Sequence, residues 1–217
     1  MVLKLYGWFS STPALAAAML LHEKNVPFEW VEVDLTKSEQ NLPEFLAKTP
    51  FHEVPLIEDG EFILSESRAI ARYLDEKYPN QGTQFYPADV QRRAVVDQIT
   101  WNDTFHFGQF GTRVVLEILN RKYFGMPTDT KAAEEAKKAL FINLDIYETI
   151  LSKQKYIAGN ELTIADIIHI PVAARLVQEV GLNIGEGRPN VYRWVSEIIA
   201  RESWAKAKEI FFAHPSH

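Results

Sequence analysis

Two short groups of residues near the start of the chain could together hold a small peptide-like ligand. Glu66-Ser67 opens a helical pattern, where free backbone N–H groups and the helix dipole attract a carboxylate. The Glu66 carboxylate could in turn receive an ammonium group. Ten residues separate this pair from Val54-Pro55. If the Val54-Pro55 peptide bond is cis, it turns the backbone of Val54 toward a peptide ligand; the alternative is an ordinary trans proline that opens a strand. The two groups predict a site for a ligand with both an α-carboxylate and an α-amine.

The elements that would position these groups alternate between strand and helix. An Asp59-Gly60 turn predicts a hairpin, and the other segments follow from apolar periodicity. In chain order the prediction is strand Val2–Tyr6, helix Thr12–Lys24, strand Phe28–Asp34, helix Leu42–Lys48, strands Val54–Glu58 and Glu61–Leu64, and helix Ser65–Tyr78. This order predicts an α/β, thioredoxin-like N-terminal domain, with a mixed four-stranded sheet and helices packed on it.

After the turn-rich stretch Pro79–Thr83 the pattern becomes helical throughout. The expected helices are Asp89–Phe124 (interrupted near Gly108 and Gly111), Thr130–Lys153, Thr163–Val180, Val191–Ala200 and Ser203–Phe212. Thr163 and Asp166 have the spacing of a capping box, and Pro171 should kink the buried helix that follows. We therefore expect a domain of residues 1–79, a linker of 80–88, and an all-α C-terminal helical domain of 89–217.

Composition excludes several kinds of chemistry. The 217 residues include no cysteine, so disulfides, thiolate metal sites and a cysteine nucleophile are ruled out, and thiol–disulfide exchange is not expected. No His pair has metal-ligand spacing, so no metal is expected. The net charge of −6 argues against nucleic-acid binding. Without a long apolar run or a secretory pattern at the start, we expect a cytoplasmic protein that does not enter the membrane.

The layout resembles the cytosolic glutathione transferases. Three motifs carry the resemblance: Thr49-Pro50-Phe51-x-x-Val54-Pro55, Phe62-x-x-Ser65-Glu66-Ser67-Arg68-Ala69-Ile70, and Tyr156-Ile157-Ala158-Gly159-Asn160-x-Leu162-Thr163-Ile164-Ala165-Asp166. The first two are most similar to the phi class of plants and its fungal relatives. The resemblance implies glutathione as co-substrate, bound mainly by the N-terminal domain through Gln40, Asn41, Glu53, Val54, Pro55, Glu66 and Ser67.

The resemblance also implies that Ser11 is the catalytic residue. A hydroxyl at the mouth of the first helix can donate a hydrogen bond to the glutathione sulfur and favour its thiolate. From the residue types alone, Ser10, Ser11 and Thr12 could equally be caps of that helix. Tyr6 is a competing activator, because other classes of the family use a tyrosine at the end of the first strand.

Three residues depart from the phi pattern. Glu53 stands where that pattern has Gln, and an ionised Glu can only accept hydrogen bonds. Gln40 and Asn41 stand where phi-class relatives commonly have His and Lys for the glycyl carboxylate. Lys37 or His52 could supply the missing cation.

No motif identifies the pocket for the second substrate. Aromatic residues close to Ser11 and on the first long helix of the C-terminal domain could form an apolar wall, or could instead be internal packing. The candidates are Trp8, Phe9, Thr12, His106, Phe107, Phe110 and Arg113. The resemblance further implies a homodimer with Phe51 and Arg68 at its interface.

The function expected from these residues is conjugation of the glutathione thiolate to apolar electrophiles, and glutathione-dependent peroxidase activity is a further expectation. The alternative is a non-catalytic, ligandin-type carrier of hydrophobic small molecules, which the departures at Gln40, Asn41 and Glu53 would favour.

Overall fold

The structure is a computed structural model that describes residues 2–214. The chain forms two compact units. The first contains the chain through Gln84 together with the C-terminal segment from Glu202, and the second is Phe85–Arg201. The expected fold class is confirmed, because the first unit contains a four-stranded sheet with helices and the second contains only helices apart from one isolated bridge.

The sheet of the first unit has the strand order β2-β1-β3-β4. Strand β1 (Leu3–Gly7) pairs in parallel with β2 (Phe28–Glu32) and antiparallel with β3 (Leu56–Asp59). Strand β3 forms the predicted hairpin with β4 (Phe62–Ser65), and Gly60 in the turn has a φ of 67°. The Asp59-Gly60 turn chemistry therefore identified the hairpin correctly.

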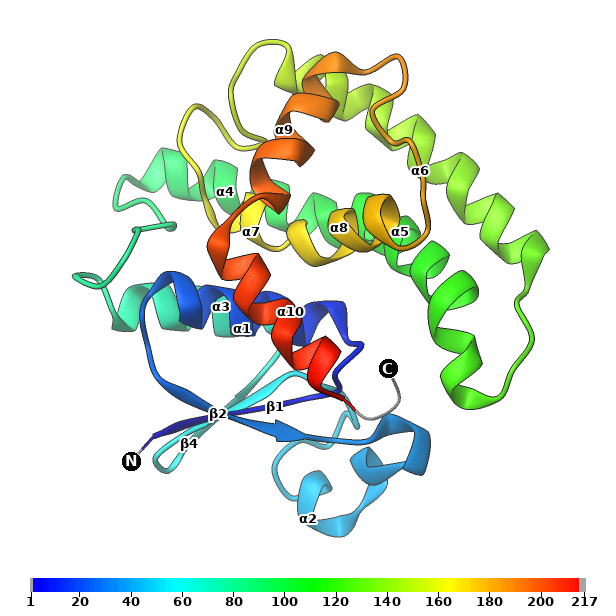
Figure 1. The fold of residues 1–217 in the computed structure, drawn as a ribbon. Coiled ribbons are helices and arrows are strands. Elements are labelled where there is room, and N and C mark those ends of the chain that lie inside the picture. The colour runs from blue at the N-terminus through cyan, green and yellow to red at the C-terminus, as the bar shows by residue number, and fades with distance from the viewer. Residues whose placement is uncertain (1, 215–217) are drawn as a thin grey trace. The chain divides into compact units, whose positions relative to one another are not determined.

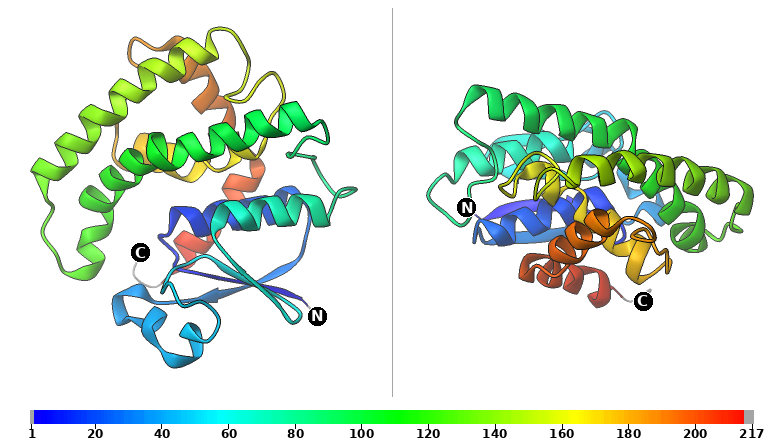
Figure 2. Two further views of the ribbon diagram at one scale, coloured as in Figure 1. Left: turned by 180° about the vertical axis from the view of Figure 1, so that it is seen from behind. Right: turned by 90° about the horizontal axis from the view of Figure 1, so that it is seen from above.

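Helices α1 (Thr12–Glu23) and α3 (Ser67–Lys77) lie side by side on one face of this sheet (Figures 1 and 2). The opposite face holds the short helices η1 (Leu35–Lys37), η2 (Glu39–Asn41) and α2 (Pro43–Leu46), where Val33, Phe45 and Leu56 form a buried cluster. The C-terminal helix α10 (Glu202–Ala213) packs along α1 (Figure 1). Because α1 is covered by the sheet, α3 and α10, its Ala14–Leu21 stretch is buried all round.

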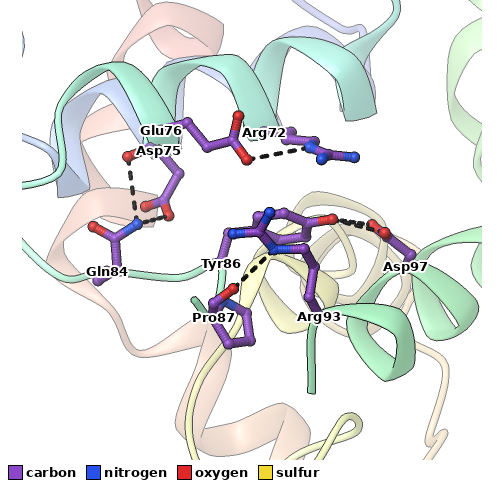
Figure 3. A network of polar contacts seen from close by, with 8 residues as sticks. All are labelled: Arg72, Asp75, Glu76, Gln84, Tyr86, Pro87, Arg93 and Asp97. Carbon is purple, nitrogen blue, oxygen red and sulfur yellow. Dashed lines mark hydrogen bonds and ion pairs between the residues drawn. The ribbon is translucent and has the colours of Figure 1, made fainter. Parts of the chain in front are cut away.

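A buried ion pair ties the end of α1 to α3. The ammonium of Lys24 lies 3.0 Å from the Asp75 carboxylate and 3.0 Å from the Thr83 carbonyl oxygen, and both charged side chains are fully buried. The Gln84 amide also donates to Asp75 (Figure 3). Polar groups buried in this way need such partners. The bonds of Lys24 to Thr83 and of Gln84 to Asp75 therefore hold the segment after α3 within the first unit.

The second unit begins with α4 (Val90–Phe105) and α5 (Phe107–Val115). Near its start, the Tyr86 hydroxyl donates to Asp97 at 2.7 Å, and Arg93 donates to the Pro87 carbonyl oxygen at 3.0 Å (Figure 3). A π-helical turn η3 (Leu116–Asn120) and a 3₁₀ turn η4 (Arg121–Phe124) follow. The remaining helices are α6 (Thr130–Leu151), α7 (Ile164–Ile167), α8 (Ile170–Gln178) and α9 (Pro189–Ile199).

The helix breaks lie close to the expected positions but not at them. The first long helix breaks at His106, whose φ is −129° and ψ is −99°, two residues before Gly108. Gly111 instead lets α5 approach α8, since a Cβ there would lie 2.6 Å from Val172. The helix expected over Thr163–Val180 is two helices, and Pro171 lies in the first turn of α8, where its missing N–H has no intrahelical role.

The core of the second unit is an aromatic group from three helices and the turn before α8. Phe107, Tyr147 and Trp194 surround His169, which is fully buried. The Tyr147 hydroxyl lies 2.9 Å from His169 Nε2, and the Ala165 carbonyl oxygen lies 2.5 Å from His169 Nδ1. His169 is therefore a core histidine whose two ring nitrogens both have hydrogen-bond partners.

Candidate functional site

A cavity of about 190 Å³ in the first unit brings the two groups of the sequence argument together. It lies between the chain before β3 and the start of α3. Its lining residues are Pro13, Thr49, Phe51, Glu53, Val54, Pro55, Ser65, Glu66, Ser67 and Arg68. Val54-Pro55 and Glu66-Ser67 therefore line the same cavity, because the β3–β4 hairpin folds the chain back between them.

The start of α3 is suited to an anion. Glu66 is its N-cap residue, and the Glu66 side chain makes no capping hydrogen bond to the first turn. The backbone N–H groups there can therefore serve a bound carboxylate, which the helix dipole stabilises. Glu66 has a φ of 72°, an uncommon value for a residue with a side chain, and such conformations cluster at ligand sites.

The Val54-Pro55 peptide, which also lines the cavity, is cis as expected. Val54 is half-buried and Pro55 is buried. The cavity also contains charges of both signs, since Arg68 lines it together with Glu53 and Glu66. Arg68 was expected only at a subunit interface, so its guanidinium is an additional candidate for ligand binding.

Of the three consecutive hydroxyl residues after β1, Ser11 is the accessible one. Ser10 is fully buried and Thr12 is 5% exposed, whereas Ser11 is half-buried. Ser11 is the N-cap of α1, and its Oγ accepts a long hydrogen bond of 3.4 Å from the Ala14 N–H. Capping uses a lone pair of the oxygen, so the hydroxyl proton stays available for a ligand. Ser11 is not among the lining residues of the cavity, but Pro13 on the same helical turn is.

Tyr6 is engaged elsewhere. Its hydroxyl donates to the Glu58 carboxylate, and the Lys48 ammonium lies 3.4 Å from the Tyr6 hydroxyl oxygen. Burial and the bond to Glu58 raise the pKa of the Tyr6 phenol. Tyr6 lines a second cavity of about 250 Å³ together with Val31, Phe45 and Lys48. With its proton held by Glu58, Tyr6 is poorly placed to donate to a ligand in the first cavity.

Gln40 and Asn41, expected to contact glutathione, do not line the first cavity in the described residues. Asn41 Oδ1 lies 2.7 Å from His52 Nδ1, so His52 is held beside the position where the phi pattern has a cation. Lys37, the other proposed substitute, pairs with Asp34 at 2.9 Å. The structure therefore favours His52 over Lys37 as a replacement.

Sequence reasoning missed Pro13, Thr49 and Ser65 as lining residues. Thr49 is 1% exposed, and its hydroxyl has no hydrogen-bond partner within the described part of the chain. A buried hydroxyl without a partner is costly, and its position at the cavity makes it a candidate ligand contact. The sequence pointed to Thr49 only as part of the Thr49-Pro50-Phe51 motif, because sequence does not show which groups surround a threonine hydroxyl.

The residues expected to form the electrophile pocket lie in both units. In the first unit, Trp8, Phe9 and Thr12 are all buried. In the second, Phe107 is fully buried in the aromatic core, Phe110 is half-buried, and His106 is exposed. Arg113 is half-exposed and pairs with the buried Glu117 at 2.8 Å. The complete enclosure of Phe107 favours packing over ligand contact, and the pocket itself stays a prediction.

Within residues 2–214, no group of three or more His, Asp or Glu side chains is arranged to hold a metal ion. Over the same residues, none of the helices combines the length and the apolar character needed to cross a bilayer.

Comparisons with known proteins agree with this geometry. Residues 1–76 match the family model described as "Glutathione S-transferase, N-terminal domain", and residues 112–202 match "Glutathione S-transferase, C-terminal domain". Glutathione S-transferase F12 of Arabidopsis thaliana is 37% identical over 207 residues, which cover 95% of this chain and 97% of that protein.

Solved structures give the same result. Glutathione transferase F7 from Populus trichocarpa matches with a TM-score of 0.90 and 33% identity, covering 97% of this chain and 99% of that one. Glutathione S-transferase I from mais (maize), solved in complex with an atrazine glutathione conjugate, matches with a TM-score of 0.86 and 28% identity, covering 100% of both chains. The chain belongs to the glutathione S-transferase family, and the relatives it matches include the phi-class (F) enzymes of plants.

Proposed function

We propose that this protein is a serine-type glutathione transferase, which binds glutathione in the cavity at the start of α3 and directs its thiolate at an apolar electrophile. The observation that carries the proposal is the shared cavity of Val54-Pro55 and Glu66-Ser67. These groups come from separate parts of the chain and offer complementary halves of a peptide site. Relatives named as glutathione S-transferases, and the maize enzyme solved with a glutathione conjugate, support it.

Each part of glutathione has a counterpart in this chain. The γ-glutamyl carboxylate would accept from Ser67 and from the first N–H groups of α3, and the α-ammonium would pair with Glu66. The cysteinyl backbone would hydrogen-bond the Val54 backbone in the manner of an added strand. Arg68 would balance the negative charge that glutathione brings to a cavity already containing Glu53 and Glu66.

Ser11 would act on the sulfur. Its hydroxyl donates a hydrogen bond to the thiolate, and the start of α1 adds positive potential, so more of the bound thiol is ionised at neutral pH. The thiolate then forms the carbon–sulfur bond to the electrophile while the leaving group departs with the electron pair. The protein itself needs no nucleophile, which agrees with the absence of cysteine from the sequence.

A direct experiment separates this function from that of a carrier. The purified protein should be retained on immobilised glutathione, eluted by free glutathione, and should conjugate a generic aryl halide. Retention without turnover would point to a ligandin-type carrier. A protein that is neither retained nor active would contradict the proposed site altogether.

The binding half of the site predicts the effect of two substitutions. Ser67→Ala and Glu66→Ala should each raise the dissociation constant for glutathione about 10- to 100-fold, the effect of losing one charge-assisted hydrogen bond. Isothermal titration calorimetry measures both. Glu61→Ala, at an exposed residue of the same hairpin outside the cavity, is the matched control and should bind normally. Unchanged binding in both test variants would disprove the site.

We also propose that the protein is a homodimer with Phe51 at the interface. Phe51 is 71% exposed, a large apolar surface to leave in water, and it belongs to the Thr49-Pro50-Phe51 motif. On α4, Trp101 and Phe105 are each 61% exposed and offer further apolar surface for a second copy.

Phe51→Ser should therefore raise the dimer dissociation constant about 30-fold or more, as expected for an aromatic residue at the centre of an interface. Sedimentation velocity at micromolar concentration reports the shift toward monomer. Tyr192→Ser, which alters a similarly exposed aromatic residue at 65% exposure, should leave the dimer intact. A wild-type protein that sediments as a monomer would refute the interface.

A further inference from the structure

The turn that carries Ser11 is short and joins β1 directly to α1. A backbone hydrogen bond closes it, from the Ser11 N–H to the Trp8 carbonyl oxygen at 2.8 Å. Phe9 and Ser10 occupy the middle of the turn, and both are buried. The position of the Ser11 hydroxyl therefore depends on what holds Phe9 and Ser10.

Glu32, the last residue of β2, holds the backbone of this turn. One carboxylate oxygen accepts from the Phe9 N–H at 3.0 Å, and the other accepts from the Trp30 indole N–H at 2.8 Å. The parallel pairing of Gly7 with Glu32 brings the end of β2 beside the start of the turn. Both oxygens of Glu32 are thus used to connect the turn to the neighbouring strand.

The C-terminal segment holds the side chain of the same turn. The ring of His214, directly after α10, stacks on Phe9 with a centroid distance of 3.9 Å and an interplanar angle of 7°. Phe211 on α10 lies 5.8 Å from the Phe9 ring. One residue of the turn, Phe9, is therefore held through its N–H by β2 and through its ring by the end of the chain.

We propose that Glu32 and His214 are positioning residues for Ser11, an inference that rests on the proposed function. Neither needs to touch glutathione. Together they fix the Trp8–Ser11 turn so that the Ser11 hydroxyl meets the sulfur at hydrogen-bond distance. Such precision matters, because displacing a reacting group by about 1 Å can cost about 100-fold in rate.

The charge of Glu32 makes it possible to distinguish a positioning role from a direct electrostatic effect on the sulfur. Burial raises the pKa of Glu32, while the bonds from Phe9 and Trp30 and the nearby His214 oppose that shift, and Asp34 adds to it. A negative charge near the sulfur would disfavour the thiolate. If Glu32 acted only as a charge, its removal would lower the pKa of the bound thiol. If it positions Ser11, its removal raises that pKa.

Glu32→Gln tests the backbone half of the arrangement. The amide has one oxygen for two donors, so its NH₂ group faces either Phe9 or Trp30. We expect kcat for conjugation to fall about 10-fold, with KM for glutathione within about twofold. The pKa of the bound thiol, followed by thiolate ultraviolet absorbance against pH, should rise by about half a unit or more. Glu29→Gln, an exposed residue of the same strand, is the control.

His214→Ala tests the side-chain half. Like Glu32→Gln, it should lower kcat and raise the pKa of the bound thiol. His214→Phe, which keeps a flat ring without a titratable nitrogen, should restore both values. Glu209→Ala on the exposed face of α10 is the control. Failure of His214→Phe to rescue would show that stacking on Phe9 is not what matters.

Comparison with Ser11→Ala separates failure of the positioning role from failure of the proposed function. If the wild type conjugates and Ser11→Ala is impaired, the proposed function stands, and a normal or lowered thiol pKa in Glu32→Gln overturns the positioning role alone. If the wild type does not conjugate, or Ser11→Ala is fully active, the proposed function fails first.

Discussion

Ser11→Ala is expected to lower kcat for conjugation about 100-fold or more, with little change in glutathione affinity. In the proposed site the hydroxyl would contact the glutathione molecule only at its sulfur, whereas affinity would come from the γ-glutamyl and backbone contacts at α3 and Val54. Loss of one donor to a developing or stabilised anion typically costs this much. Steady-state kinetics measures the rate, and thiolate absorbance against pH should show a higher pKa for the bound thiol.

Two other substitutions sharpen the assignment of Ser11. Ser10→Ala alters a fully buried neighbour and should raise the bound-thiol pKa less than Ser11→Ala does. Tyr6→Phe removes a hydroxyl that donates to Glu58, so it should leave conjugation close to normal. Full activity in Ser11→Ala together with loss of activity in Tyr6→Phe would reverse the assignment in favour of the tyrosine.

Asp166→Ala is expected to lower the free energy of unfolding by about 3–5 kcal/mol, the effect of breaking a buried, charged hydrogen-bond network. The Asp166 carboxylate is fully buried and accepts from the N–H groups of Ile157 and Thr163, at 3.0 and 2.9 Å, and from the Trp194 indole at 2.9 Å. Removing it leaves several donors in the core without a partner, and each costs free energy.

Urea denaturation followed by circular dichroism measures this loss. The matched control is Asp145→Ala on α6, whose carboxylate is 66% exposed and pairs with Arg188. An exposed pair contributes about 1 kcal/mol or less. Similar destabilisation by the two variants would show that the Asp166 network is no more than an ordinary polar contact.

Local rules predicted the parts of the fold that depend on neighbouring residues. The Asp59-Gly60 turn and the Thr163–Asp166 capping box are both present, because turn and cap preferences act over a few positions. The helix expected over Thr130–Lys153 is present as α6, and its residues at helical spacing, Ala136, Leu140, Leu144, Tyr147 and Leu151, are buried. These signals need no knowledge of the rest of the chain.

Breaks set by tertiary packing were not predictable in the same way. Gly108 and Gly111 suggested a helix interruption, yet Gly111 serves the close approach of α5 to α8, and the break falls at His106. The π-helical turn at Leu116–Asn120 had no sequence signal either. There the Glu117 carboxylate is fully buried and accepts from Arg121, an arrangement that periodicity does not encode.

The candidate site also contains some residues that local sequence predicts and others that only the structure identifies. The motif residues Val54, Pro55, Glu66 and Ser67 meet in one cavity as expected, since a single hairpin connects them. The accessibility of Ser11 over Ser10 and Thr12 required the structure. The contacts of Glu32 and His214 with Phe9 join three distant parts of the chain, so no local pattern could have identified them.

The packing of α10 on α1 has a consequence for biosynthesis. Trp204, Ala207 and Phe211 of α10 are buried in the first unit, although every residue of the second unit precedes them in the chain. Translation proceeds from the N-terminus at about 5–20 residues per second. The second unit is therefore fully synthesised while the first still lacks its final helix. A ribosome stalled before Glu202 would hold a nascent chain whose α1 has one face still open to a chaperone.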